Sequence, residues 1–235
     1  MTTVAAFANA HSHVFHRALR GRVTGADISA PLLAVARDRA AAEAPGGVAI
    51  QFIEADVETV DLGRFDHSLS RFGVMFFPDS ARAFANIRRM LKPGGRLTFL
   101  CWRTLPENLW VSVPRDAVLP LLAEIPPPPE PNTPGPFRFA DPDPLVALLR
   151  GTGFDSVTCD AVDRDIVLGQ GETDAAATAA ATHVSLNLGP NSHLVREAAP
   201  DLRARAEAAV TEILRRHAEG GTVRLRAACW LVQAE

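Results

Sequence analysis

The stretch RVTGADISAPLLAVARDRAAAEAPGGVAIQFIEADV, residues 22–57, decides the fold class. Residues 22–28 form a short apolar run typical of a strand, and residues 30–44 carry apolar side chains at helical spacing. The PGG at residues 45–47 ends this helix, and residues 48–57 form a second apolar run. A strand, a helix and a strand in this order predict a βαβ unit with parallel strands.

The same alternation continues downstream. Residues 65–77 predict a third strand, residues 79–92 a helix, and residues 96–102 a fourth strand after a second PGG. The helix is expected to turn one side inward, namely Ala83, Phe84, Ile87, Met90 and Leu91. Because the strands are almost continuously apolar, we expect an α/β fold with a mostly parallel sheet covered on both faces.

The second half of the chain has a different pattern. Residues 124–139 are rich in proline and predict an extended surface loop without a helix. The elements expected after it are a helix at 141–154 with Asp141 or Asp143 as N-cap, a strand at 155–168, helices within 172–188 and 199–219, and a closing strand at 223–234. We expect that closing strand to be antiparallel and the late helices to form a lid. The predicted divisions are an atypical N-terminal segment at 1–22, a core at 23–105, a proline-rich loop or lid at 106–140, and the C-terminal part of the sheet with a helical lid insert at 141–235.

Composition narrows the function classes. The chain has 235 residues, 47% of them hydrophobic and 22% charged, and a net charge of −3, so nucleic acid and anionic membranes are not expected partners. No apolar run is long enough to cross a bilayer, and the N-terminus lacks the pattern of a signal peptide. Three widely separated cysteines, Cys101, Cys159 and Cys229, indicate a reduced cytoplasmic protein with buried thiols and no metal-ligand spacing.

Four segments in order resemble the class I S-adenosylmethionine-dependent methyltransferases: VTGADIS, FIEADVE, SRFGVMFF and LKPGGRLTF. The resemblance covers residues 23–102 well and the rest of the chain more loosely. It implies a Rossmann-like sheet and S-adenosyl-L-methionine as cofactor. The residues that it implies for cofactor binding are Asp27 and Ile28 at the ribose, Asp56 and Val57 at the adenine, and Ser70, Arg71 and Phe72 beside the methionine part.

Physical chemistry supports this placement and also offers alternatives. In an open parallel sheet, ligands bind beyond the carboxyl ends of the strands, and both Asp27 and Asp56 follow apolar strand residues. An acid after a strand is also often a helix cap or a turn former, so each residue alone is weak evidence. Phe72, Phe76 and Phe77 are expected either to line the cofactor site or to be core, with core favoured for Phe76 and Phe77.

The N-terminus departs from the family pattern. The family's first strand ends in a glycine-rich loop such as D-x-G-x-G-x-G, and the only glycine before Val23 is Gly21. Only 22 residues precede Val23, too few for a strand, a loop and a full helix. One option is a crossover helix over residues 4–19 with the first strand missing or replaced, and the other is a makeshift first strand TTVAAFA. The helix is the favoured option.

The segment NAHSHVFHRALRGR, residues 9–22, has a resemblance of its own, to the H-x-H opening of metal-dependent amidohydrolases. That resemblance implies His11 and His13 as metal ligands. The further ligands that such a site needs have no counterpart downstream, so a solvated histidine-rich helix face is favoured and no metal is predicted.

The resulting prediction is methyl transfer from S-adenosylmethionine to a small molecule, impaired by loss of the glycine-rich loop. The alternative is an inactive methyltransferase-like relic or fusion product, and a metal-dependent amidohydrolase is the third reading. No base is assigned, since His183 and His193 are expected to be exposed residues of the helical lid. The expected partner is a small-molecule methyl acceptor, with a homodimer left open.

Overall fold

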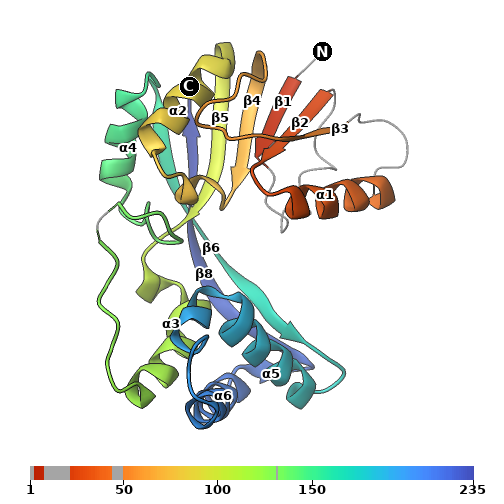
Figure 1. The fold of residues 1–235 in the computed structure, drawn as a ribbon, viewed down its shortest axis with the longest axis vertical. Coiled ribbons are helices and arrows are strands. Elements are labelled where there is room, and N and C mark those ends of the chain that lie inside the picture. The colour runs from red at the N-terminus through yellow and green to blue at the C-terminus, as the bar shows by residue number, and fades with distance from the viewer. Residues whose placement is uncertain (1–2, 8–21, 44–49, 131) are drawn as a thin grey trace. The chain divides into compact units, whose positions relative to one another are not determined.

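A computed structural model describes residues 3–7, 22–43, 50–130 and 132–235 (Figure 1). The chain divides into two compact units. The first unit contains residues 1–101, 132–161 and 230–235, and the second contains residues 102–131 and 162–229.

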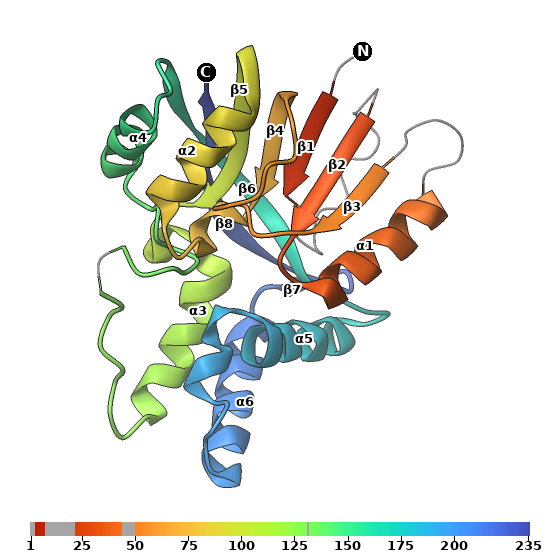
Figure 2. The same cartoon turned by 45° about the horizontal axis from the view of Figure 1, so that its top comes forward.

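The first unit is built on parallel strands. These are β1 (Thr3–Phe7), β2 (Arg22–Asp27), β3 (Ile50–Glu54), β4 (Phe65–Arg71) and the first part of β5 (Leu91–Trp102). The order is β3-β2-β1-β4-β5, and each of these neighbouring pairs is parallel (Figure 2). The expected α/β architecture with a mostly parallel sheet is therefore confirmed.

The favoured prediction for the N-terminus is wrong at its start. Residues 3–7 form a strand and not the beginning of a helix, and β1 occupies the central place between β2 and β4. Its register pairs Phe7 with Ala26 on one side and with Ser70 on the other. The reason is that an unfilled centre would leave two strand edges with unpaired N–H and C=O groups. The rest of the predicted helix lies outside the described residues.

The crossover from β1 to β2 explains why residue counting failed. Residues 8–21 connect the two parallel strands, and these 14 residues meet the minimum of about a dozen that a parallel connection needs. The prediction had assumed a first strand and helix of average length, which the 22 residues before Val23 do not provide.

Two helices of the first unit follow the predicted strand–helix alternation. Helix α1 (Ala30–Glu43) packs against β2 and β3, and helix α2 (Ser80–Met90) lies beside α4 (Pro142–Gly151). The predicted inner side of α2 is confirmed, because Ala83, Phe84, Ile87, Met90 and Leu91 are all buried. Asp79 caps α2 by accepting from the Arg82 N–H at 3.0 Å, and Asp141 caps α4 by accepting from the Asp143 N–H at 3.0 Å.

Two long C-terminal strands complete the sheet as β5-β8-β6. They are β6 (Val157–Gln170) and β8 (Thr222–Ala234), with the short β7 (Ala218–Glu219) paired antiparallel to β8. Ser156 and Glu235 exchange N–H···O bonds of 3.3 and 3.0 Å, which is the pattern of an antiparallel pair. This agrees with the predicted antiparallel closing strand.

The second unit is mainly helical. Its helices are α3 (Leu109–Val118), α5 (Asp174–His183) and α6 (Pro200–Arg215), and α5 continues into a π-helix at Val184–Leu188. Short 3-10 turns lie at Leu105–Glu107, Leu119–Leu121 and Pro190–Leu194. The core of this unit joins Val118, Ala181, Val210 and Leu225, among others. As predicted, the described part of residues 124–139 contains no helix.

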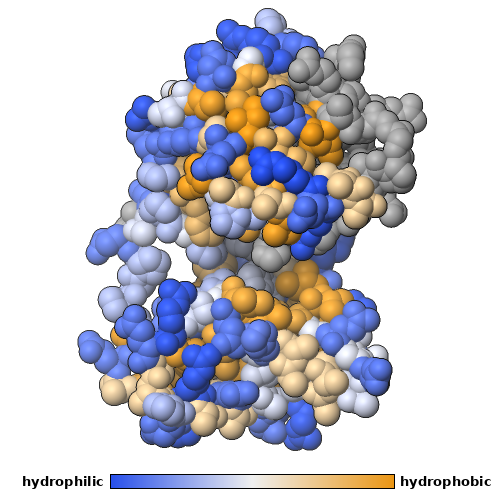
Figure 3. All heavy atoms as spheres, turned by 45° about the vertical axis from the view of Figure 1, so that its right-hand side comes forward, coloured by the Kyte–Doolittle hydropathy of each residue, from blue (hydrophilic) through white to orange (hydrophobic). Residues whose placement is uncertain are grey.

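Figure 3 shows hydrophobic residues in patches between hydrophilic ones on the face that it displays. Among the described helices, none has the length and apolar character that a membrane crossing requires.

Candidate functional site at the carboxyl edge of the sheet

The seven predicted site residues lie at one edge of the first unit. They follow or end the neighbouring strands β2, β3 and β4, whose carboxyl ends point the same way. The chain runs from β1 outward to β2 and β3 and then returns to β4 on the other side of β1. The order of the strands therefore reverses beside β1, and such a switch point is where open α/β sheets bind ligands.

Asp27 ends β2 and acts as a turn acceptor, with the helix cap provided by its neighbour. Its Oδ1 accepts from the Ser29 N–H at 2.8 Å, while the Ser29 hydroxyl accepts from the Leu32 N–H at 3.4 Å at the start of α1. Partial burial raises the pKa of Asp27, and the N–H groups of Ser29 and Ile28 oppose that rise. The helix cap is therefore Ser29, so capping does not account for the half-buried carboxylate of Asp27.

Ile28, next in the chain, is 73% exposed. An isoleucine in water at the end of a buried strand offers an apolar surface directly beside a carboxylate. A flat, apolar ring with hydroxyl groups nearby is the kind of ligand that such a pair fits.

Asp56 and Val57 follow β3, and β3 is tied to Asp27. The Ala55 N–H donates to the main-chain oxygen of Asp27 at 3.0 Å, so the ends of β2 and β3 are joined. Asp56 is exposed, and its Oδ1 accepts from the Glu58 N–H at 2.9 Å. The Asp56 carbonyl accepts from Thr59 and Val60 at 3.1 and 2.9 Å, which closes a tight turn. Val57 in this turn has a buried side chain.

Asn86 on α2 holds this turn in place, a role that was not predicted from the sequence. Its Nδ2 donates to the carbonyls of Val57 at 2.8 Å and Val60 at 2.7 Å. Its Oδ1 accepts from Arg89 Nη2 at 2.7 Å and Nε at 3.1 Å, and Arg89 in turn pairs with Asp61 at 3.0 Å. The signal was a polar residue within the apolar inner side of α2.

The end of β4 gathers buried polar atoms without partners. The hydroxyls of Ser68 and Ser70 and the Nε of Arg71 are buried and have no hydrogen-bond partner in the part of the chain that the structure describes. Most buried polar atoms in proteins are paired, so three unpaired ones within four residues call for an explanation. A polar ligand that binds at this edge is such an explanation.

The backbone after β4 is strained. Phe72 has a φ of +61°, in the left-handed region that non-glycine residues rarely adopt, and its N–H donates to the Leu100 carbonyl at 3.0 Å. A Cβ on Gly73 would lie 3.1 Å from the Ser70 hydroxyl, so this turn packs tightly on Ser70. A strained residue persists only where the surrounding structure fixes it, and such residues are concentrated at active sites and ligand sites.

The proline-rich segment anchors the next residues of this turn. The Gly135 N–H donates to the Met75 carbonyl at 3.1 Å, and Arg138 donates to the Phe77 carbonyl. The prediction of core for Phe76 is wrong, because its side chain is 51% exposed. The short 3-10 helix Val74–Phe76 turns it outward. Phe77 is partly buried and meets the Phe84 ring edge-on at 6.1 Å, in keeping with a core role.

The residues at this edge fit the cofactor that the sequence resemblance implies. Phe7 of β1 pairs with Ala26, the neighbour of Asp27, on one side and with Ser70 on the other. Asp27 and Ser70 are therefore separated by about two strand spacings, roughly 10 Å. One end of the edge offers carboxylates and an apolar side chain, and the other offers hydroxyls and a guanidinium. S-adenosylmethionine has the complementary order, with ribose and adenine at one end and an amino acid at the other.

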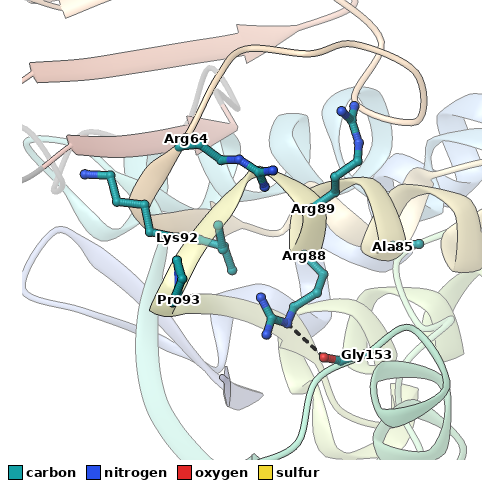
Figure 4. A pocket seen from close by; sticks show the side chains of 8 residues that line it. Arg64, Ala85, Arg88, Arg89, Lys92, Pro93 and Gly153 are labelled. Atoms are coloured by element: carbon teal, nitrogen blue, oxygen red, sulfur yellow. Dashed lines mark hydrogen bonds between the residues drawn. The ribbon is translucent and has the colours of Figure 1, made fainter.

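A pocket of the first unit lies elsewhere, at the amino ends of β4 and β5. Its volume is about 630 Å³, and its lining includes Arg64, Arg88, Arg89 and Lys92. Figure 4 shows Arg88 bonded to the Gly153 carbonyl, at 2.8 Å, and Arg89 pointing away from it. Because Arg89 and Lys92 pair with Asp61 and Asp66 and no common ligand position results, this is a solvated basic surface at the end of α2.

The histidines give no metal site in the described part of the chain. No cluster of three or more His, Cys, Asp or Glu side chains that could hold a metal ion occurs among the described residues. His11 and His13 lie outside those residues. His183 and His193 are exposed in the second unit, where His193 Nδ1 lies 2.6 Å from the Pro190 carbonyl oxygen and His183 Nδ1 lies 3.3 Å from Asn187 Nδ2.

Comparison with known proteins points to one family. Residues 6–99 match the family model described as "Methyltransferase domain". The demethylmenaquinone methyltransferase of Thermus thermophilus is 32% identical over 151 residues, which are 59% of this chain and 66% of that protein. The ubiquinone/menaquinone biosynthesis C-methyltransferase UbiE of Pseudomonas aeruginosa is 31% identical over 152 residues, with shares of 59% and 57%. The chain thus spans about six tenths of the length of these curated relatives.

Solved structures show the same fold at lower identity. A methyltransferase-like protein of Bacillus halodurans is similar over 99% of this chain and 91% of its own, with 15% identity and a TM-score of 0.57. Phosphoethanolamine N-methyltransferase 2 of Haemonchus contortus, solved with S-adenosylhomocysteine, has 14% identity and a TM-score of 0.51, with shares of 99% and 48%. At these identities the likeness concerns the fold alone.

Proposed function

Because the chain belongs by family to the class I S-adenosylmethionine-dependent methyltransferases, we propose that it transfers a methyl group from this cofactor to a small organic molecule. The observation that carries the proposal is the carboxyl edge of the first unit. Asp27 ends β2 and Asp56 follows β3, and the last residues of β4 carry buried polar atoms that have no partner among the described residues. A fold alone supports many functions, so this arrangement of residues matters more than the architecture.

In this proposal each residue has a binding role. Asp27 accepts hydrogen bonds from the two ribose hydroxyls, and the exposed Ile28 covers one face of the adenine. Asp56 accepts from the adenine amine, and the N–H of Val57 faces the ring nitrogen, in the turn that Asn86 holds. Ser70, Arg71 and Phe72 border the amino-acid end.

The chemistry requires positioning more than acid or base groups. The cofactor supplies an activated methyl group on a sulfonium, and the protein must hold it in line with the acceptor atom. Fixing two reactants in such a geometry alone removes a large part of a reaction barrier, on the order of 7–11 kcal/mol at best. The strained, tightly packed turn at Phe72 and Gly73 supports this role, because it fixes the edge of the site.

For the acceptor we propose a demethylated quinol whose ring carbon takes the methyl group. The support is likeness to the two relatives above, a demethylmenaquinone methyltransferase and a quinone C-methyltransferase. A demethylated naphthoquinol with a short side chain is the first acceptor to test, by mass spectrometry of the product after incubation with S-adenosylmethionine.

The experiment that tests cofactor binding is a calorimetric titration with S-adenosylhomocysteine. Wild type is compared with Asp27→Ala and with Asp38→Ala, an exposed acid on α1, as matched control. We expect micromolar binding that Asp27→Ala weakens at least tenfold and Asp38→Ala leaves unchanged. No binding to folded wild type would support the alternative of an inactive relic, since the glycine-rich loop of the family is absent from residues 8–21.

A further inference from the structure

We infer that the guanidinium of Arg71 binds the α-carboxylate of the cofactor's amino-acid group, an inference that rests on the proposed function. Arg71 is the last residue of β4, so it stands at the carboxyl edge itself. Its partner in the sheet is Leu100 of β5, and its neighbour Ser70 pairs with Phe7 of β1. The side chain therefore starts beside the switch point of the sheet.

The side chain of Arg71 has a buried donor that an anion could accept from. Its Nε is buried and has no hydrogen-bond partner within the described residues, and Arg71 takes part in none of their ion pairs. A half-buried cation without a counter-charge is costly, so native proteins usually pair it. A guanidinium offers two parallel N–H donors that match the two oxygens of a carboxylate.

The electrostatics of Arg71 agree with this picture. Burial lowers the pKa of its guanidinium because the charged form loses solvation, and among the described residues no neighbouring carboxylate counters that effect. An incoming carboxylate would restore the missing counter-charge. The same edge holds the buried Ser70 hydroxyl, 2% exposed, as a further donor or acceptor.

The glycine-rich loop that binds this part of the cofactor in the family is missing after β1. The family's glycine-rich loop lets the backbone approach the carboxypropyl and ribose groups of the cofactor, and residues 8–20 of this chain contain no glycine. A chain without that loop needs other donors for the carboxylate. The unpaired donors that the structure describes at this edge are those at the end of β4.

The test separates the carboxylate from the rest of the ligand. S-adenosylhomocysteine carries the amino-acid group, and 5′-methylthioadenosine has the same nucleoside and sulfur without it. Both are titrated into wild type, Arg71→Gln, Arg71→Lys and the control Arg82→Gln, which changes an exposed arginine on α2. Melting temperatures of the free proteins show whether each variant is folded.

We expect Arg71→Gln to weaken S-adenosylhomocysteine roughly 10- to 100-fold, the range for losing a charged hydrogen-bond partner, and to leave 5′-methylthioadenosine within about twofold. Arg71→Lys should lose less, because it keeps the charge without the paired donors. Arg82→Gln should change neither affinity.

Two results would overturn the inference. An unchanged affinity of Arg71→Gln for S-adenosylhomocysteine would mean that Arg71 does not meet the carboxylate. An equal loss for both ligands in Arg71→Gln and Arg71→Lys would mean that Arg71 only supports the fold of the site. If folded wild type bound neither ligand, the proposed function would fail as well, so the two failures are distinguishable.

Discussion

Replacing Asn86 by alanine should both destabilise the protein and weaken cofactor binding. The change removes two hydrogen bonds of 2.7 and 2.8 Å to the carbonyls of Val57 and Val60, and two that Arg89 donates to Oδ1. Asn86 is only 7% exposed, so the groups left behind are poorly solvated. Asn86 thus links α2 to the turn that carries Asp56 and Val57.

The magnitude follows from these contacts. Each buried hydrogen bond contributes about 1 kcal/mol net, and a buried group left unpaired costs about 1–3 kcal/mol. We therefore expect Asn86→Ala to lower the free energy of unfolding by about 2–4 kcal/mol. For a chain of this length that corresponds to a fall in Tm of roughly 5–15 °C. Loosening of the turn should raise the Kd for S-adenosylhomocysteine about tenfold, since 1.4 kcal/mol of lost binding is one decade.

The matched control is Asn108→Ala in the second unit. Asn108 is fully buried, donates to the carbonyls of Thr104 at 3.0 Å and Ala228 at 3.1 Å, and accepts from the Ala228 N–H at 2.9 Å. It should lower Tm by a similar amount. Measured at a temperature where both variants are folded, the Kd of Asn108→Ala should equal that of wild type.

Scanning calorimetry and titration calorimetry of the two variants decide the question. A lower Tm with an unchanged Kd for Asn86→Ala would refute the reasoning that Asn86 positions a cofactor-binding turn. An equal loss of affinity in both variants would also refute it, because the effect would then be a general consequence of lower stability.

Three further predictions concern stability and reactivity. Asp27→Asn should raise the Tm of the ligand-free protein at pH 7, because burial raises the pKa of Asp27 and the ionised form opposes folding. The gain in Tm should fade as the pH drops below about 4, where the carboxyl is protonated in the folded and unfolded states. The same variant should bind S-adenosylhomocysteine more weakly. Burial raises the pKa of Cys229 to about 12, so iodoacetamide at pH 8 should leave it unmodified in the folded protein and modify it in urea, as mass spectrometry of the tryptic peptide would show. Gly169→Ala should lower Tm by roughly 3–12 °C, because a Cβ there would lie 2.3 Å from the Ala177 carbonyl oxygen. Gly151→Ala should change Tm little, because beyond its chain neighbours and the backbone of its own helix no atom lies within 4 Å of an added Cβ. Equal Tm values for the two glycine variants would contradict the described packing.

The parts of the fold that the sequence predicted are those decided by burial. The run at residues 22–28 became β2, and the helical apolar spacing of α2 placed Phe84 and Ile87 in the core. The run predicted as a strand at residues 65–77 became β4 only as far as Arg71, and the 3-10 helix Val74–Phe76 follows it. In these segments local pattern and tertiary environment agree. The signal is strong because a sheet covered on both faces needs continuous apolar strands.

Strand β1 could not be predicted in this way. Its five residues TVAAF are too few to carry a period, and the favoured helix used the apolar residues that follow. The strand is selected by its place between β2 and β4. The backbone N–H and C=O groups of those two strands need hydrogen-bond partners, and any short apolar segment can supply them. This is a case where tertiary context overrides local pattern.

The candidate site divides along the same line. The positions of Asp27 and Asp56 at the carboxyl edge were predictable, because Asp27 ends one apolar strand and Asp56 lies two residues beyond another. The hydrogen bond from Asn86 to the Val57 turn joins residues that are 29 positions apart, and it forms only because α2 packs against that turn. A local sequence pattern does not show such a contact. The exposure of Phe76 was missed for a similar reason, since only the 3-10 turn after β4 decides it.

The balance of polar groups along the edge links the unusual N-terminus to the proposed activity. Buried donors without partners cost stability, and a strained residue such as Phe72 adds to that cost. A chain that had lost its ligand would gain stability by replacing Ser70 or Arg71 with apolar residues, because nothing in the described fold requires their polar atoms. Their presence beside the switch point, in a chain without a glycine-rich loop, favours an edge that still binds a polar ligand over a relic of one.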